Sequence, residues 1–215
     1  MNIIPNVLCD LTAPVKRGKG ELRIDRLKKE MERQGIVEYK IWPTIEVPDK
    51  PRRTSISRGH KQIVQWAMEE GLEEVCIFED DIRFPAEDNY QYFLSKKPKE
   101  PYDIYLGGVY RGEIDANFIV ERYTGQICYI ISERYYDRFL ATDERLDIDG
   151  GQANRGKFFV CFPFAAIQHK GFSINCQEEM DQDYLLVGKP IRGLEVYDIK
   201  GMSAERVIPV DPLSF

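Results

Sequence analysis

The stretch Val75-Cys76-Ile77-Phe78-Glu79-Asp80-Asp81 sets four apolar residues directly before three carboxylates. A short run that is apolar at every position is typical of a strand in a parallel sheet, with helices on both faces. In an open α/β sheet, ligands bind beyond the carboxyl ends of the strands. The sequence therefore predicts a buried strand at 75–78, whose acidic end lies at a ligand-binding edge.

The segments before this stretch alternate between the strand and helix patterns. Strands are expected at 3–8 and 39–45, and helices at 21–34 and from Ser55 or Ser57 to Gly71. The order strand, helix, strand, helix, strand favours an α/β fold. The second half predicts a mixed arrangement, with strands at 104–106, 119–120, 127–131 and 159–162 and a helix at 133–141.

Composition narrows the classes of protein. The 215 residues suit one domain, and the net charge of −6 argues against a nucleic-acid partner, which needs a concentrated basic surface. No apolar run is long enough to span a bilayer, and residues 1–5 lack the pattern of a signal peptide, so we expect a cytoplasmic location. The five cysteines form no CxxC pair, which predicts buried thiols rather than zinc ligands or disulfides.

Several polar residues should share the edge that carries the acidic end. Strand ends and helix starts meet at one rim of an α/β sheet, so the following residues are expected to line a nucleotide site there: Asp10, Thr44, Ser57, Arg58, His60 and Asp80. His60 is expected in the first turn of its helix. A surface or capping histidine is the alternative for His60.

The three carboxylates repel one another, and a divalent cation such as Mn²⁺ or Mg²⁺ would neutralise them. The alternative is a solvated acidic turn. Glu79 and Asp81 are the candidate metal ligands. His169 follows an apolar run, and it is either a third ligand or a partly buried histidine bonded to the backbone.

A catalytic base is expected in the sequence Asp147-Ile148-Asp149-Gly150-Gly151. Alternation puts Asp147 and Asp149 on one side if the segment is extended, and the glycines would let a substrate approach closely. A loop or a helix cap is the alternative. Arg17, Arg23 and Arg26 could contact a diphosphate, although each could equally belong to a solvated face.

These pieces resemble, in order, the family 25 glycosyltransferases, which include the lipopolysaccharide and collagen galactosyltransferases. The similar segments are Ser57-Arg58-Gly59-His60, Ile77-Phe78-Glu79-Asp80-Asp81-Ile82, residues 102–106, residues 124–132 and residues 168–174. The family usually has Ser before the histidine, where this chain has Gly59. Asp147 or Asp149 corresponds to a later aspartate of the family.

The resemblance implies a single GT-A-like α/β domain with a mixed central sheet flanked by helices. Residues 1–110 would form a nucleotide-binding half, residues 111–180 an acceptor and catalytic half, and residues 181–215 an irregular tail. The implied activity is an inverting, Mn²⁺-dependent transfer of a sugar such as galactose from a UDP-sugar to a surface glycan, as in lipopolysaccharide biosynthesis. The resemblance also implies that Asp81 ligates the metal directly. Peripheral association with a membrane is left open.

Two other functions fit the same pattern. A sugar nucleotidyltransferase also combines a metal with an α/β nucleotide fold, and it normally has a Gly-rich basic loop after the first strand. Residues 12–20 contain Gly18, Gly20 and three basic residues, so this alternative stays open. A non-catalytic module that binds a nucleotide-sugar is the other alternative.

Overall fold

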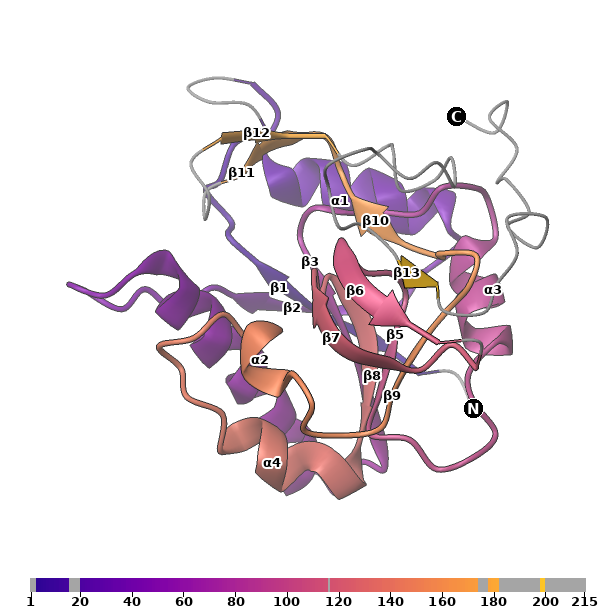
Figure 1. Ribbon diagram of the computed structural model, residues 1–215. Coiled ribbons are helices and arrows are strands. Elements are labelled where there is room, and N and C mark those ends of the chain that lie inside the picture. The colour runs from indigo at the N-terminus through magenta and orange to yellow at the C-terminus, as the bar shows by residue number, and fades with distance from the viewer. Residues whose placement is uncertain (1–2, 16–19, 116, 174–177, 182–197, 200–215) are drawn as a thin grey trace.

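The computed structural model describes residues 3–15, 20–115, 117–173, 178–181 and 198–199. A six-stranded mixed sheet with the order β2-β1-β3-β8-β5-β9 forms its centre (Figure 1). β1 pairs in parallel with β2 and β3, β8 runs antiparallel to β3 and β5, and β9 is parallel to β5. The predicted mixed α/β architecture is therefore confirmed. Most of the expected tail, 182–197 and 200–215, lies outside the described residues.

The first half follows the expected alternation of strands and helices. Its elements are β1 (Pro5–Cys9), α1 (Arg23–Arg33), β2 (Lys40–Pro43), α2 (Arg52–Glu69), β3 (Glu74–Glu79), β4 (Ile82–Arg83) and α3 (Asn89–Ser95). The acidic residues thus stand at the end of β3, between this central strand and the short strand β4.

The second half supplies the antiparallel part of the sheet and three smaller sheets. Its elements are β5 (Ile104–Leu106), β6 (Arg111–Ile114), β7 (Val120–Thr124), β8 (Cys128–Ser132), η1 (Glu133–Tyr135), α4 (Tyr136–Leu140), η2 (Gly150–Gln152), β9 (Phe158–Val160), β10 (Ile167–Gln168), β11 (Gly171–Ser173), β12 (Glu178–Met180) and β13 (Asp198–Ile199). The smaller sheets are β10-β4, β11-β12 and β13-β6-β7. The pair β10-β4 brings residues near 168 back to the acidic end of β3.

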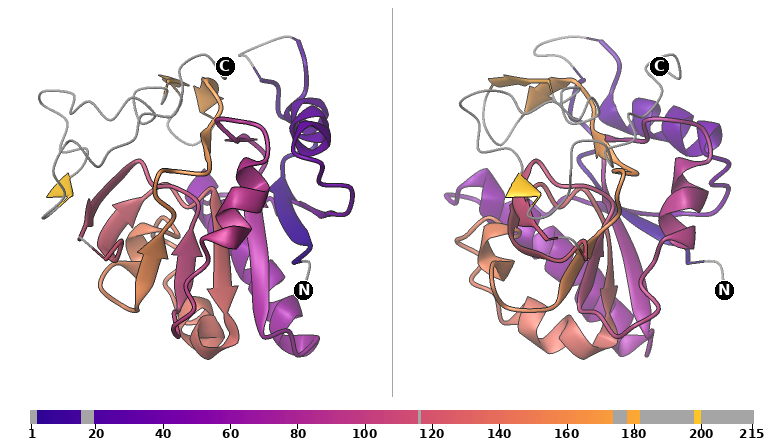
Figure 2. Two further views of the ribbon diagram at one scale, coloured as in Figure 1. Left: turned by 90° about the vertical axis from the view of Figure 1, so that its right-hand side faces the viewer. Right: turned by 45° about the vertical axis from the view of Figure 1, so that its right-hand side comes forward.

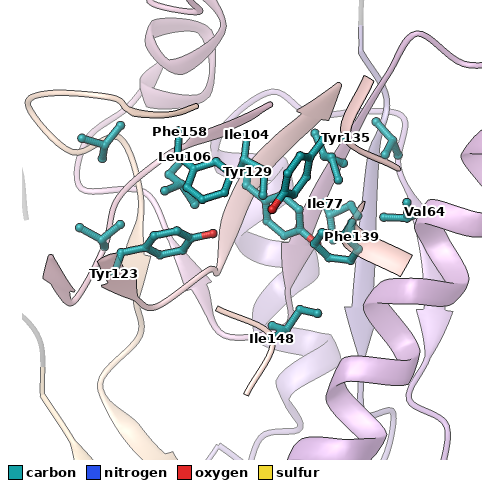
Figure 3. Packing of buried hydrophobic residues seen from close by; sticks show 14 of the residues in the cluster. Val64, Ile77, Ile104, Leu106, Tyr123, Tyr129, Tyr135, Phe139, Ile148 and Phe158 are labelled. Atoms are coloured by element: carbon teal, nitrogen blue, oxygen red, sulfur yellow. The ribbon is translucent and has the colours of Figure 1, made fainter. Parts of the chain in front are cut away.

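Helices cover both faces of the central sheet (Figures 1 and 2). Side chains alternate along β3: Val75 and Ile77 pack with α2 and α4, whereas Cys76 and Phe78 pack with α1 and α3. Figure 3 shows Ile77, Tyr129 and Phe139 together in the first of these two cores. Burial on both faces explains why 75–78 is apolar at every position.

Two sequence expectations about local structure are wrong. α2 begins at Arg52, directly after Pro51, so Ser55 and Ser57 lie inside the helix and His60 lies beyond its first turn. Proline and the helix-forming arginines favour this earlier start. Asp149 is not in an extended segment, because it is the N-cap of the short helix η2. The helix-cap alternative holds for this residue.

Close packing explains the glycine at position 59. A Cβ atom there would lie 2.4 Å from Leu8 Cδ1, so a serine in α2 would have to displace a buried side chain of β1. The departure from the family pattern thus permits the close approach of α2 to the central sheet. Within the described residues, no helix combines the length and apolar character needed to cross a membrane.

Candidate functional site

The three acidic residues at the end of β3 are held by hydrogen bonds and ion pairs with Arg23, Gln168 and His60. Asp80 accepts from Arg23 Nη1 at 2.8 Å and from the Asp10 backbone N–H at 2.8 Å. Asp81 lies 3.2 Å from the same Arg23 nitrogen and accepts from Gln168 Nε2 at 2.5 Å. Glu79 pairs with His60. The acidic turn is therefore enclosed, not solvated, since Asp80 and Asp81 are buried.

Arg23 neutralises much of the negative charge of Asp80 and Asp81. The sequence alone had predicted that a metal ion would do this. This arginine is buried, and its second terminal nitrogen donates to Phe172 O at 2.7 Å. Burial works against the charge of Arg23, but Asp81 and Asp80 more than offset it and raise the pKa of Arg23. Repulsion among the carboxylates alone is thus no longer an argument for a cation.

The site still contains one carboxylate oxygen suited to a cation. Asp81 Oδ1 is buried, and no described residue bonds to it. Among the described residues, no three His, Cys, Asp or Glu side chains are grouped so that they could hold a metal ion. A cation on Asp81 would thus need further ligands such as water, which Mg²⁺ usually keeps in proteins.

His60 is fully buried and joins Glu79 to the core. Its Nε2 lies 3.2 Å from Glu79 Oε1, and its Nδ1 lies 2.9 Å from the Tyr129 hydroxyl. Burial and the charges of Asp81 and Asp80 raise the pKa of Glu79, against the lowering effect of His60. His60 is thus placed to orient Glu79, and neither a surface nor a capping position describes it.

Asp10 begins the opposite side of the site, after β1. Its carboxylate accepts from the Thr12 backbone N–H at 3.0 Å and pairs with Arg52 at 2.5 Å. Burial acts to raise the pKa of Asp10, but the Thr12 and Arg52 contacts lower it overall. The Thr44 backbone N–H donates to Cys9 O at 2.9 Å, which sets Thr44 beside the end of β1.

Two predicted nucleotide-site residues turn toward another segment. Ser57 Oγ donates to Leu146 O at 3.0 Å, and Arg58 pairs with Glu144 at 2.7 Å. Both partners lie in the loop between α4 and η2. This loop is close to α2 because α4 packs against α2. The structure thus brings Asp10, His60 and Asp80 to the acidic end but directs Ser57 and Arg58 to the loop before Asp149.

Asp149 accepts hydrogen bonds from Gly150 N and Gly125 N, both at 2.7 Å. Burial and the charge of Asp147 raise the pKa of Asp149, against the lowering effect of these backbone bonds. A raised pKa suits a general base, since it strengthens the carboxylate as a proton acceptor. Asp147 is exposed.

A chain of contacts connects Asp149 to the acidic end of β3. Gly125 has a φ of +92°, and a Cβ there would lie 2.5 Å from Tyr110 Cγ, so the turn requires glycine. The Tyr110 hydroxyl donates to Gln168 Oε1 at 2.9 Å, and Gln168 donates to Asp81. The candidate base and the candidate metal ligand are therefore connected through Tyr110 and Gln168.

His169 donates its backbone N–H to Asp81 O at 2.7 Å. The buried Nε2 of its imidazole has no partner among the described residues. Burial and the charges of Arg26, Arg83 and Arg33 lower the pKa of His169 to about 3. The imidazole is neutral at neutral pH and lies among cations.

Sequence reasoning did not single out three residues of this network. They are Arg52, Tyr110 and Tyr129. No local motif marks either tyrosine. The sequence around a tyrosine in a strand or turn does not show whether its hydroxyl bonds to a residue of the core or to a residue of the site. Arg23 and Arg26 could be identified as candidates from the sequence, because they follow the first strand.

Comparison with solved structures agrees with the fold. HddC from Yersinia pseudotuberculosis superposes with a TM-score of 0.51 and 15% identity, covering 74% of this chain and 90% of HddC. The same protein complexed with GMP-PN gives a TM-score of 0.50 at 15% identity, covering 78% and 93%. At this identity the likeness defines the fold class, a mixed α/β sheet flanked by helices.

A Bacillus anthracis protein described as a glucose-1-phosphate thymidylyltransferase, solved with sucrose, has a TM-score of 0.48 and 12% identity over 74% of this chain and 86% of its own. That likeness is too slight to argue from. No protein-family model and no curated protein matches the sequence. The resemblance to family 25 glycosyltransferases gains no support from these comparisons and stays a prediction.

Proposed function

We propose that this chain is a transferase that acts on a nucleotide-linked sugar at the acidic end of β3. The observation that carries the proposal is Asp81, a buried carboxylate with one oxygen that no described residue bonds, beside the buried Arg23 of α1. An acidic ligand next to fixed cations suits a diphosphate and its divalent cation. The first candidate reaction is transfer of a hexose from a UDP-sugar to a glycan hydroxyl.

In this reaction Asp81 would hold Mn²⁺ or Mg²⁺ directly, and Asp80 would assist through water or the ribose. When bound, the cation would neutralise charge on the departing diphosphate. Arg23 holds both aspartates in place, and Gln168 fixes the second of them. Asp10 and Thr44 would contact the nucleoside at the ends of β1 and β2. Ser57 and Arg58 would act indirectly, by holding the loop that ends at Asp149.

Asp149 would accept the proton of the attacking hydroxyl, with Asp147 in reserve. A base must lie on the acceptor side, because a carboxylate that binds a cation has its lone pairs engaged. Asp149 is held by two backbone N–H groups, which leaves further lone pairs for a substrate proton. Its raised pKa favours the same role. A surface glycan remains the expected acceptor.

The second candidate is transfer of a nucleotide to a sugar phosphate. The HddC complex with GMP-PN favours it, since that protein of the same fold was solved with a nucleotide, and this supports nucleotide chemistry more than transfer from a UDP-sugar. The sequence of the first loop agrees with this candidate, because residues 12–20 contain Gly18, Gly20 and three basic residues. A Gly-rich basic loop is the usual cradle of a triphosphate.

Two incubations distinguish the candidates. In the first, the protein is given UDP-sugars with Mn²⁺, and free UDP is measured with and without glycan acceptors. In the second, it is given nucleoside triphosphates and sugar 1-phosphates, and pyrophosphate is measured. UDP release alone supports glycosyl transfer, and pyrophosphate release alone supports nucleotidyl transfer. Binding of a nucleotide-sugar in a thermal-shift assay without either product would mean a non-catalytic module.

A further inference from the structure

A group of cationic residues lies between α1 and the ladder that β4 forms with β10. In that ladder Arg83 pairs with Ile167 and Ile82 pairs with Gln168, and the His169 backbone bonds to Asp81. Alternation therefore puts Asp81, Arg83 and His169 on one face of the ladder. α1 packs on β4 and brings Arg26 to the same space.

Buried polar atoms in this space lack partners. His169 Nε2, Arg26 Nε and Arg23 Nε are all enclosed, and none bonds to a described residue. Such atoms are rare in folded proteins, because each costs about 1–3 kcal/mol when desolvated without a hydrogen bond. Three of them around one space indicate that a ligand or ordered water completes the hydrogen bonds.

The charges around His169 indicate the sign of that ligand. The guanidinium groups that lie close enough to act on the imidazole are those of Arg26, Arg83 and Arg33. Arg33 is engaged with Glu30 and with Phe84 O. A divalent cation on His169 Nε2 would be repelled by these guanidinium groups, whereas an anion would be attracted to them.

The backbone that follows His169 closes this space against α1. Arg23 donates to Phe172 O, and a Cβ on Gly171 would lie 3.7 Å from Arg26 Nη1. The consecutive strands β10 and β11 thus lie near α1 (Figure 1). Because Asp81 stands at the edge of the same space, an anion bound here would lie next to any cation that Asp81 holds.

We propose that Arg26, Arg83 and His169 form a binding site for the diphosphate of a nucleotide or nucleotide-sugar. Guanidinium and imidazole N–H groups suit phosphate oxygens, and a diphosphate can span from this cluster to Asp81. His169 is therefore a phosphate ligand, not a metal ligand. The identity of the ligand rests on the proposed function. The sign of its charge does not, because it follows from the arginines around His169.

The test measures calorimetric binding of pyrophosphate and of UDP to the full chain in EDTA, so that no divalent cation contributes. The variants are Arg26→Gln and His169→Ala, and Lys29→Gln is the control. Lys29→Gln also removes one positive charge from the same helix, but Lys29 is exposed and pairs with the nearby Glu21. Each cluster variant should weaken pyrophosphate binding about 10- to 100-fold, the value of one hydrogen bond to a charged group.

The control should change affinity by about twofold or less, since exposed ion pairs contribute little. Mn²⁺ binding, measured without nucleotide, should be unchanged by His169→Ala. The proposal is overturned if His169→Ala weakens Mn²⁺ binding and leaves pyrophosphate affinity unaltered, or if neither variant changes pyrophosphate affinity.

If a variant does not fold, the wild-type chain still decides the matter by NMR. The sequence contains only two histidines, so two imidazole signals are expected, and saturating pyrophosphate should shift one of them. No shift in either signal overturns the proposal. Pyrophosphate binding without any transfer activity would reject the proposed function alone, whereas transfer activity with unchanged pyrophosphate affinity in both variants would reject this inference alone.

Discussion

The acidic residues at the end of β3 and those in the loop before η2 contrast sharply in how they are held. Asp80 and Asp81 are buried, and their partners Arg23 and Gln168 stand 57 and 87 residues away in the chain. In the loop, Asp143 bonds mainly to Arg145, and Asp149 bonds to Gly150 and to Gly125.

The difference shows that the pKa values of acidic residues depend on their surroundings in the fold, not on the acidic pattern alone. Burial of Asp80 and the neighbouring Asp81 charge raise the pKa of Asp80, against the lowering effect of Arg23. The half-buried Asp143 has its pKa lowered to about 2 by its hydrogen bonds with Arg145. A cation would therefore change the energetics of the first group greatly and those of the second very little.

The largest expected effect is that of Asp81→Asn on transfer. Asn can still accept from Gln168, and Asp80 keeps its pair with Arg23, so the fold should persist. Loss of the carboxylate removes the proposed cation ligand, and we expect turnover to fall by at least ~10²–10³-fold. Turnover with Mn²⁺ and the melting temperature should be measured together. Near-normal Mn²⁺-dependent turnover would reject the role of Asp81.

Asp149→Asn tests the loop side of the comparison. Removal of a general base should cost about 10²–10⁴-fold in turnover, with UDP-sugar and metal affinity nearly unchanged. Because the carboxylate accepts two backbone N–H groups, some stability should also be lost. Asp147→Asn is the matched control, since it removes an exposed carboxylate of the same loop. If only the control loses turnover, the base is Asp147, and if neither does, both assignments fail.

Arg23→Met should destabilise the acidic end without touching the loop. It leaves Asp80 and Asp81 buried with no cation, and breaking a buried pair in this way costs about 3–5 kcal/mol of unfolding free energy. The exposed pair of Arg58 with Glu144 provides the control, and Arg58→Met should cost about 1 kcal/mol or less. Urea denaturation measures both. Equal losses in the two variants would mean that the acidic end is solvated after all.

The smallest effect expected is a pH dependence of stability that His169 causes. Its pKa is about 3 in the folded chain, below its ordinary value of 6.5, so the unfolded chain binds more protons between these values. The free energy of unfolding should therefore fall as pH drops below about 6.5, by at most ~1.4 kcal/mol per pH unit. His169→Gln should flatten this dependence. Denaturation curves near pH 7, 6 and 5 give the free energy of unfolding at each pH. If its dependence on pH is the same in the variant and the wild type, the buried, neutral state of His169 is contradicted.

Parts of the site could be predicted because they follow from local pattern and topology. The apolar run at 75–78 required a strand covered on both faces, and parallel pairing of β1 with β3 put Asp10 beside Asp80. The direction of Ser57 and Arg58 could not be predicted in this way. α2 begins at Arg52 and packs against α4, so the partners of these two residues come from the loop after α4, and this depends on tertiary packing.

The sequence by itself determined the mixed α/β class, the buried strand and the acidic end, because hydrophobic periodicity and strand order act over short stretches of chain. Only the tertiary structure decided which charges meet: Arg23 with Asp80 and Asp81, His60 with Glu79, and the arginines around His169. These contacts join residues that are distant in the chain. Their energies depend on burial and separation, which no local pattern encodes.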